Sequence, residues 1–83
     1  TPDYTLSFCL STPDSIDQFH QAGEKLFHKT VLRSSSQIDS DTYEYVYTVH
    51  PRQMGEGIIA ALHTQVPGIS RISLIQPETF VDV

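Results

Sequence analysis

The order of strand-like and helix-like patterns is the feature of this sequence that most constrains its fold. Tyr4–Ser11 alternates between large apolar and small polar side chains, which is typical of a strand with one buried face. From Pro13, apolar residues recur at three-to-four spacing and predict an amphipathic helix that closes on His28 and Lys29. Thr30–Ile38 then predicts a second strand, with a weaker pattern that contains three consecutive serines. The first half of the chain therefore predicts strand, helix and strand.

The second half of the chain repeats this order. Aromatic and β-branched residues dominate Tyr43–Val49 and predict a third strand. The turn before it is Asp39–Asp41, whose side chains can hydrogen-bond to local backbone, so the two strands form a hairpin. A second helix is expected from Met54, and Pro67-Gly68 ends it. The last strand is predicted over Ile69–Ile75.

Two successive strand–helix–strand units predict an α+β fold of the ferredoxin-like type. This is a βαββαβ sandwich, in which a four-stranded antiparallel sheet carries two helices on one face. Right-handed crossovers place the first and third strands in the centre, and the serine-bearing second strand at an edge. We expect residues 1–83 to form a single domain, with a C-terminal tail over residues 75–83. The predicted core consists of Leu6, Phe8, Leu10, Ile16, Phe19, Leu26, Val49, Ile58, Leu62, Ile72 and Leu74.

Composition excludes several classes of protein. Five Lys and Arg against ten Asp and Glu give a net charge of -5, which disfavours binding to nucleic acid through a basic face. A membrane span needs roughly 18 consecutive apolar residues, and the sequence has no such run. A single cysteine cannot form an internal disulfide or a zinc site built from cysteines.

The start of the sequence and its lone cysteine bear on cellular context. The chain opens on Thr1-Pro2-Asp3 without Met or a signal peptide, so we expect a domain excised from a longer protein. An unpartnered Cys9 fits a reducing compartment, and we expect a cytoplasmic location.

Residues with potential chemistry do not assemble into a recognisable catalytic pattern. Cys9 together with a histidine would make a small metal- or thiol-dependent protein, which is the alternative function. However, the histidines form no pair at helical ligand spacing, and Asp39–Asp41 lacks the ligand offsets of a calcium loop. We therefore expect no catalytic residue, no metal and no cofactor. The four histidines are His20, His28, His50 and His63.

The tyrosines at Tyr43, Tyr45 and Tyr47 allow two interpretations. They either face the helices with Val49 as part of the core, which the pattern of the first strand favours, or form an exposed face that stacks on another subunit.

Three segments carry a resemblance to a known family: the opening strand Tyr4–Phe8, the hairpin strand Tyr43–Val49, and the closing Val66–Leu74 with its Pro-Gly-Ile and Ile-Ser-Leu motifs. In these segments the chain resembles the ACT-like regulatory domains. It most resembles the cytosolic C-terminal domain of MgtC/SapB-type bacterial membrane proteins.

The resemblance implies a non-catalytic regulatory or interaction module. ACT-like domains pair side by side or back to back, and many bind small effectors near the loop after the first strand. We therefore expect a homodimer formed through a sheet edge or face, in a parent protein embedded in the inner membrane of a bacterium. A purely structural assembly module is a further alternative. For a small-molecule effector, the expected site is Thr12, Asp14 and Ser15, because these residues present a helix N-terminus beside that loop.

Overall fold

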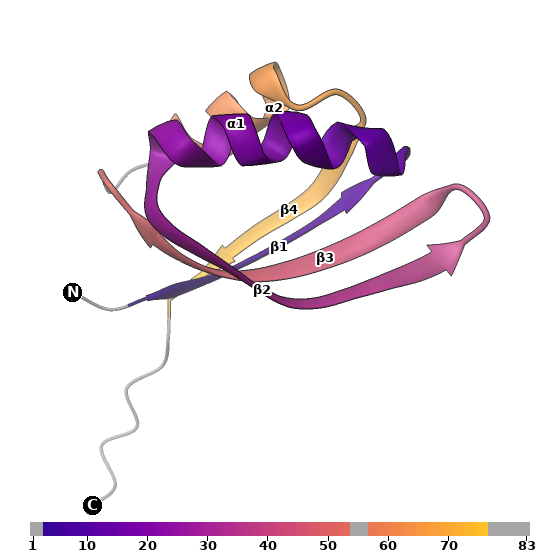
Figure 1. Ribbon diagram of the computed structural model, residues 1–83, viewed down its shortest axis with the longest axis horizontal. Coiled ribbons are helices and arrows are strands. Elements are labelled where there is room, and N and C mark those ends of the chain that lie inside the picture. The colour runs from indigo at the N-terminus through magenta and orange to yellow at the C-terminus, as the bar shows by residue number, and fades with distance from the viewer. Residues whose placement is uncertain (1–2, 54–56, 77–83) are drawn as a thin grey trace, which may run out of the picture.

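A computed structural model describes residues 3–53 and 57–76, in one βαββαβ order (Figure 1). A short 3-10 turn, η1, precedes the first helix. The part of the chain predicted as the start of the second helix, at Met54, lies outside the described residues, as do residues 77–83 of the predicted tail. The elements are β1 (Tyr4–Leu10), η1 (Pro13–Ser15), α1 (Ile16–Leu26), β2 (Phe27–Asp39), β3 (Thr42–Pro51), α2 (Gly57–Gln65) and β4 (Ile69–Ile75).

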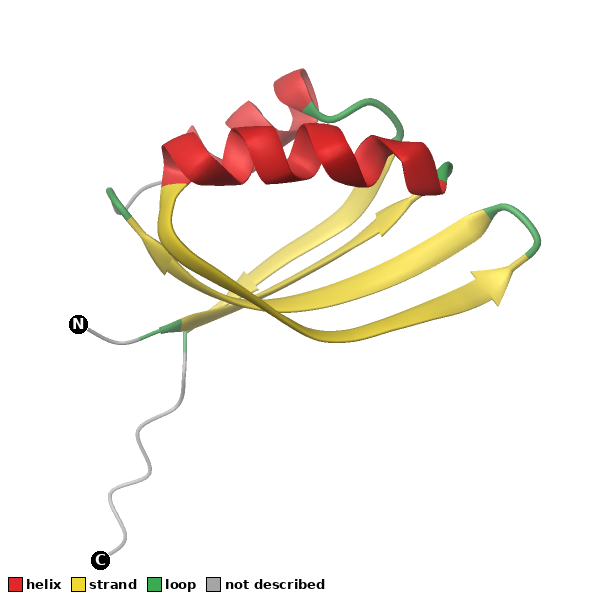
Figure 2. Ribbon diagram, viewed as in Figure 1, coloured by secondary structure: helices red, strands yellow, loops and turns green. Residues whose placement is uncertain are grey.

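The sheet is antiparallel throughout, and its strands lie in the order β2-β3-β1-β4. Both helices cover one face of it, as Figure 2 shows by colour. The predicted α+β fold, the central position of β1 and β3 and the edge position of β2 are therefore confirmed. The arrangement is compatible with a ferredoxin-like fold. Neither helix in the described part of the chain is long and apolar enough to cross a membrane.

The core lies between the sheet and the two helices. Along β1, the alternation places Leu6, Phe8 and Leu10 on the helix side with no more than 1% of their surface exposed. Every residue of the predicted core lies in this cluster or packs against it. The cluster also contains residues that the core prediction omitted: Tyr4, Ala22, Phe27, Tyr47, Val66 and Ile69.

The interpretation that the tyrosines of β3 face the helices as part of the core is confirmed for Tyr45 and Tyr47. Tyr47 is 4% exposed and lies opposite Leu6, and Tyr45 lies opposite Phe8 and packs against the core. The Phe8 and Tyr47 rings stack, with centroids 5.9 Å apart. The interpretation that these tyrosines form an exposed stacking face is wrong for Tyr45 and Tyr47.

The boundary between α1 and β2 differs from the sequence prediction. The helix ends at Leu26, not at His28 and Lys29, and β2 begins at once at Phe27. The reason is that Phe27 pairs with Pro51 of β3 and buries its ring there, while the backbone N–H of Arg52 donates to the carbonyl of Leu26 at 2.9 Å. A strand partner thus competes successfully with a further helical turn.

In β4 an extra residue interrupts the alternation. Ser7 pairs with Ser73, but Cys9 pairs with Ser70, so β4 bulges between these two pairs. Arg71 sits at the bulge with a φ of 53°, a left-handed conformation that non-glycine residues adopt at a cost. Because Ile69 and Ile72 are three positions apart, a regular strand would send them to opposite faces. The bulge lets both pack toward the core.

The link between α2 and β4 needs its glycine. Gly68 has a φ of 74°, and a Cβ there would collide with the Ser11 hydroxyl. The Ser11 backbone N–H also donates to the Gly68 carbonyl at 3.2 Å. The predicted Pro67-Gly68 stop is confirmed in this way.

Candidate ligand groove

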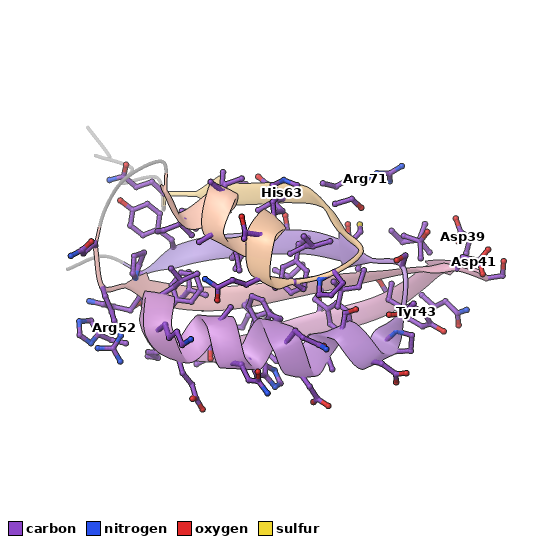
Figure 3. The ribbon with its side chains drawn as sticks, turned by 90° about the horizontal axis from the view of Figure 1, so that it is seen from above. Asp39, Asp41, Tyr43, Arg52, His63 and Arg71 are labelled. Atoms are coloured by element: carbon purple, nitrogen blue, oxygen red, sulfur yellow. The ribbon has the colours of Figure 1, made fainter. Side chains whose placement is uncertain are left out.

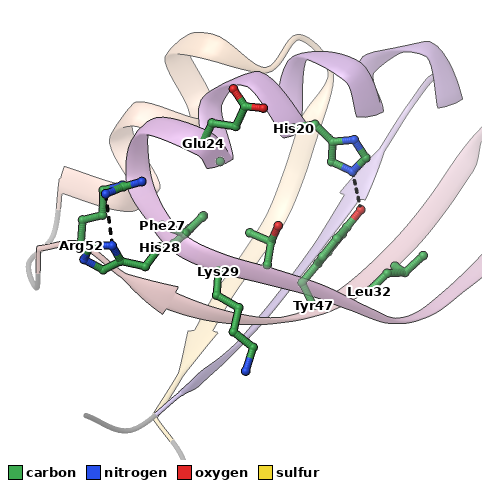
Figure 4. Close-up of a pocket in the computed structure, with 10 residues that line it drawn as sticks. His20, Glu24, Phe27, His28, Lys29, Leu32, Tyr47 and Arg52 are labelled. Carbon is green, nitrogen blue, oxygen red and sulfur yellow. Dashed lines mark hydrogen bonds between the residues drawn. The ribbon is translucent and has the colours of Figure 1, made fainter.

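An open groove lies between the C-terminal half of α1 and the start of β2 (Figure 4). It forms because β2 leaves the helix without a loop and then curves away beneath it (Figure 1). The groove has a volume of about 580 Å³. Its lining consists of His20, Gly23, Glu24, Phe27, His28, Lys29, Thr30, Leu32, Tyr47 and Arg52.

The middle of the groove is apolar. Phe27 and Tyr47 line it from the core with 2% and 4% of their surface exposed, and Gly23 lies against Phe27. A Cβ at Gly23 would meet Phe27 and Thr30 at 3.7 Å, which is ordinary contact. Leu32 lies opposite Tyr47, and therefore on the helix side of the sheet, but remains 51% exposed. The groove thus presents apolar surface that no described element covers.

One end of the groove carries Arg52 and His28. A guanidinium NH of Arg52 lies 3.1 Å from Nδ1 of His28. Because arginine can only donate, Nδ1 of His28 is the acceptor in this contact. Within residues 3–53 and 57–76, no carboxylate lies within ion-pair distance of Arg52.

The other end is closed by a contact between α1 and β3. Nε2 of His20 lies 3.0 Å from the hydroxyl of Tyr47, and Figure 4 shows the two side chains directed toward one another. Burial raises the pKa of Tyr47, with a smaller contribution from the charge of Tyr45, so the phenol stays protonated at neutral pH.

The remaining charged residues of the lining point elsewhere. Lys29 extends away from α1 on the other side of β2, where it pairs with Asp3 at 3.7 Å (Figure 4). The same carboxylate lies 3.3 Å from Nδ1 of His50. Glu24 is exposed on the outer side of α1 (Figure 4). Arg52 is therefore the cation of the groove, in a chain whose net charge is -5.

The residues expected to bind an effector lie apart from this groove. Thr12 and Asp14 are exposed and Ser15 is buried, and all three lie at the opposite end of α1. The Thr12 side chain does not cap the helix: its Oγ1 lies 3.0 Å from Oγ of Ser15, and α1 begins only at Ile16. None of these three residues lines the groove. A ligand at this loop stays a prediction.

Cys9 is buried, with 2% of its surface exposed, on a strand position between Glu44 and Ser70. Reactive cysteines are solvent-accessible and lie close to a base or a cation. Among the described residues, no group of three or more His, Cys, Asp or Glu side chains is placed to hold a metal ion.

Comparison of the chain with protein families, with curated proteins and with solved structures gives no match. Only its geometry therefore identifies the groove as a candidate site. Sequence reasoning missed its lining because the groove depends on where β2 separates from α1. Two local signals were present, namely an apolar Leu32 in a polar strand and a cation, Arg52, directly after a strand-ending proline.

Proposed function

We propose that this chain is a non-catalytic interaction domain of ferredoxin-like type that dimerises through the edge of β2. The observation that carries this proposal is β2 itself. It is a strand of 13 residues at the end of the sheet, and nearly all of it is exposed. An exposed edge presents unpaired backbone N–H and C=O groups that a second strand can pair with.

The charges along β2 favour a second copy of this chain as the partner. Lys29 and Arg33 lie in the first half of the strand, and Asp39 ends it, next to Asp41 in the turn. Figure 3 shows Asp39 and Asp41 at one end of the molecule and Arg52 at the other. In an antiparallel pair, the basic half of one strand meets the acidic end of the other, so both ends attract.

The middle of β2 suits such pairing. Ser34–Gln37 pairs with β3 without interruption, whereas irregularities occur on both sides of this segment. Its serines are small and add no charge. One of the exposed large hydrophobic residues, Ile38, also lies on β2 and would lose contact with water in a dimer.

The wider role follows the ACT-like resemblance. We place the domain in a longer bacterial protein, anchored in the inner membrane with this domain in the cytoplasm, where dimerisation and a small effector regulate the parent chain. The burial of Cys9 speaks against the thiol- or metal-dependent alternative.

A charge-swap experiment tests the dimer. One variant carries Lys29→Glu and Arg33→Glu, and the other carries Asp39→Lys and Asp41→Lys. Each edge then bears one sign of charge, so each variant alone repels its own copies. Mixed together, the two variants restore attraction at both ends.

We expect sedimentation velocity to show a concentration-dependent dimer for the original chain, monomers for each variant alone, and a dimer again for the mixture. Lys25→Glu is the matched control, because it changes the same charge on α1 and leaves β2 intact. A chain that stays monomeric at millimolar concentration, or a dimer that both variants retain, would refute pairing through β2.

A further inference from the structure

We propose that the groove between α1 and β2 binds a small organic anion, with its anionic group at Arg52 and its apolar body directed along the groove toward Leu32. This inference deepens the effector part of the proposed function, on which it rests, by giving the effector a site and a chemical class. It does not depend on dimerisation.

The size and shape of the groove fit a small molecule. Its volume of about 580 Å³ lies within the range of roughly 300–1,000 Å³ that is usual for ligand sites. Its walls come from two elements that meet at the α1–β2 junction, and Phe27 and Tyr47 are held rigidly by the core. Such a site is largely formed before the ligand arrives, which lowers the entropic cost of binding.

The apolar body of the ligand would lie on Leu32. Leu32 is half exposed although it faces the helix side of the sheet, where its neighbours across the strand are buried. An apolar or aromatic group lying here would cover Leu32 and gain the free energy of removing that surface from water.

Arg52 would bind the anionic group of the ligand. The guanidinium forms a planar fork that matches a carboxylate or a phosphate, and one of its NH groups lies at Nδ1 of His28. That contact orients the guanidinium but leaves its charge uncompensated by any carboxylate in the described part of the chain. In a chain with a net charge of -5, Arg52 gives this end of the groove a local attraction for an anion.

Amide chemical-shift titration of the complete chain tests the site with defined probes. The first probe is 4-phenylbutyrate, and 3-phenylpropyl phosphate replaces the carboxylate by a phosphate to show which anion is preferred. The neutral 4-phenylbutanamide has the same apolar body without the charge. We expect the two anions to shift amides in the second half of α1 and the first half of β2, and the amide to bind about tenfold more weakly.

Variants separate the two parts of the site. Arg52→Gln should weaken both anions by about tenfold and leave the neutral amide unchanged, because only the charge-assisted bonds are lost. Leu32→Ser should weaken all three probes alike. Lys25→Gln is the control, since it removes a cation from α1 outside the lining and should leave every affinity unchanged. Arg52 and Leu32 are exposed, so dispersed spectra of both variants will show that they remain folded.

The same titrations on the Asp39→Lys, Asp41→Lys variant keep this proposal separate from the dimer, because both substitutions lie far from the groove. Binding by that variant, whether or not the original chain dimerises, supports the groove. Equal affinity for acid and amide, an unchanged affinity of Arg52→Gln, or shifts confined to Thr12–Ser15 would overturn it.

Discussion

At the scale of single residues, Tyr47 connects the core to the groove. Its ring packs against Phe8 and Phe19, with centroid distances of 5.9 and 4.9 Å, while its hydroxyl reaches His20 at the groove. Burial of the aromatic ring therefore stabilises the fold, while the hydroxyl keeps a hydrogen-bond partner on an exposed face of α1. The Phe substitution at this position separates the two contributions.

We predict that Tyr47→Phe lowers the free energy of unfolding by about 0.5–1.5 kcal/mol at pH 7, because one hydrogen bond is lost. Burial raises the pKa of Tyr47 in the folded state, so its contribution to stability is fully present below the unfolded pKa near 10.0 and is lost as the pH rises through the folded value. The variant should therefore lose less stability than the original chain above pH 10. Urea unfolding at pH 7 and at pH 10.5 measures both effects, and equal alkaline losses would contradict the assignment.

At the scale of elements, the clearest patterns in the sequence were the most predictive. The alternation in β1 predicts its buried face, and the aromatic and β-branched content of β3 predicts a central strand, because both patterns reflect burial on a pleated surface. The end of α1 could not be predicted in the same way, since the residues up to His28 and Lys29 are compatible with a helix. Pairing between Phe27 and Pro51, which are far apart in sequence, decides it.

The bulge in β4 is a second element that local pattern could not place. Ile72 and Leu74 predict a core face, and both pack there, but Ile69 joins them only because Arg71 takes a left-handed conformation. The sequence carries no glycine at that position to signal the bulge. The candidate groove escaped prediction for a related reason, since its wall depends on the path of β2 after the helix.

We predict that Arg71→Gly is more stable than Arg71→Ala by about 1 kcal/mol, although glycine usually destabilises a strand. Glycine adopts the positive φ of 53° without steric cost, whereas alanine keeps the strain and removes the same charge. Comparing these two variants by chemical denaturation isolates the backbone effect. An alanine variant as stable as the glycine variant would mean that Arg71 is not strained.

At the scale of the whole molecule, one aromatic cluster holds α1 on the sheet. Phe8 lies at its centre: its ring is 4.5 Å from that of Phe19 on α1 and 5.7 Å from that of Tyr45 on β3, measured between centroids. A domain of 83 residues has a stability of about 4–12 kcal/mol, at roughly 0.05–0.15 kcal/mol per residue. The loss of one such side chain is then a large part of the total.

We predict that Phe8→Ala lowers the free energy of unfolding by about 3–5 kcal/mol, because it removes buried apolar surface and leaves a cavity between the sheet and α1. Leu32→Ala is the matched control, since it removes a large apolar side chain that is 51% exposed, and it should change stability by no more than about 0.5 kcal/mol. Urea denaturation followed by circular dichroism compares the two. If Phe8→Ala costs no more than Leu32→Ala, α1 is held on the sheet by contacts other than this cluster. A ligand that covers Leu32 would add stability to the domain without any change in its core, since binding to the folded state alone raises the free energy of unfolding.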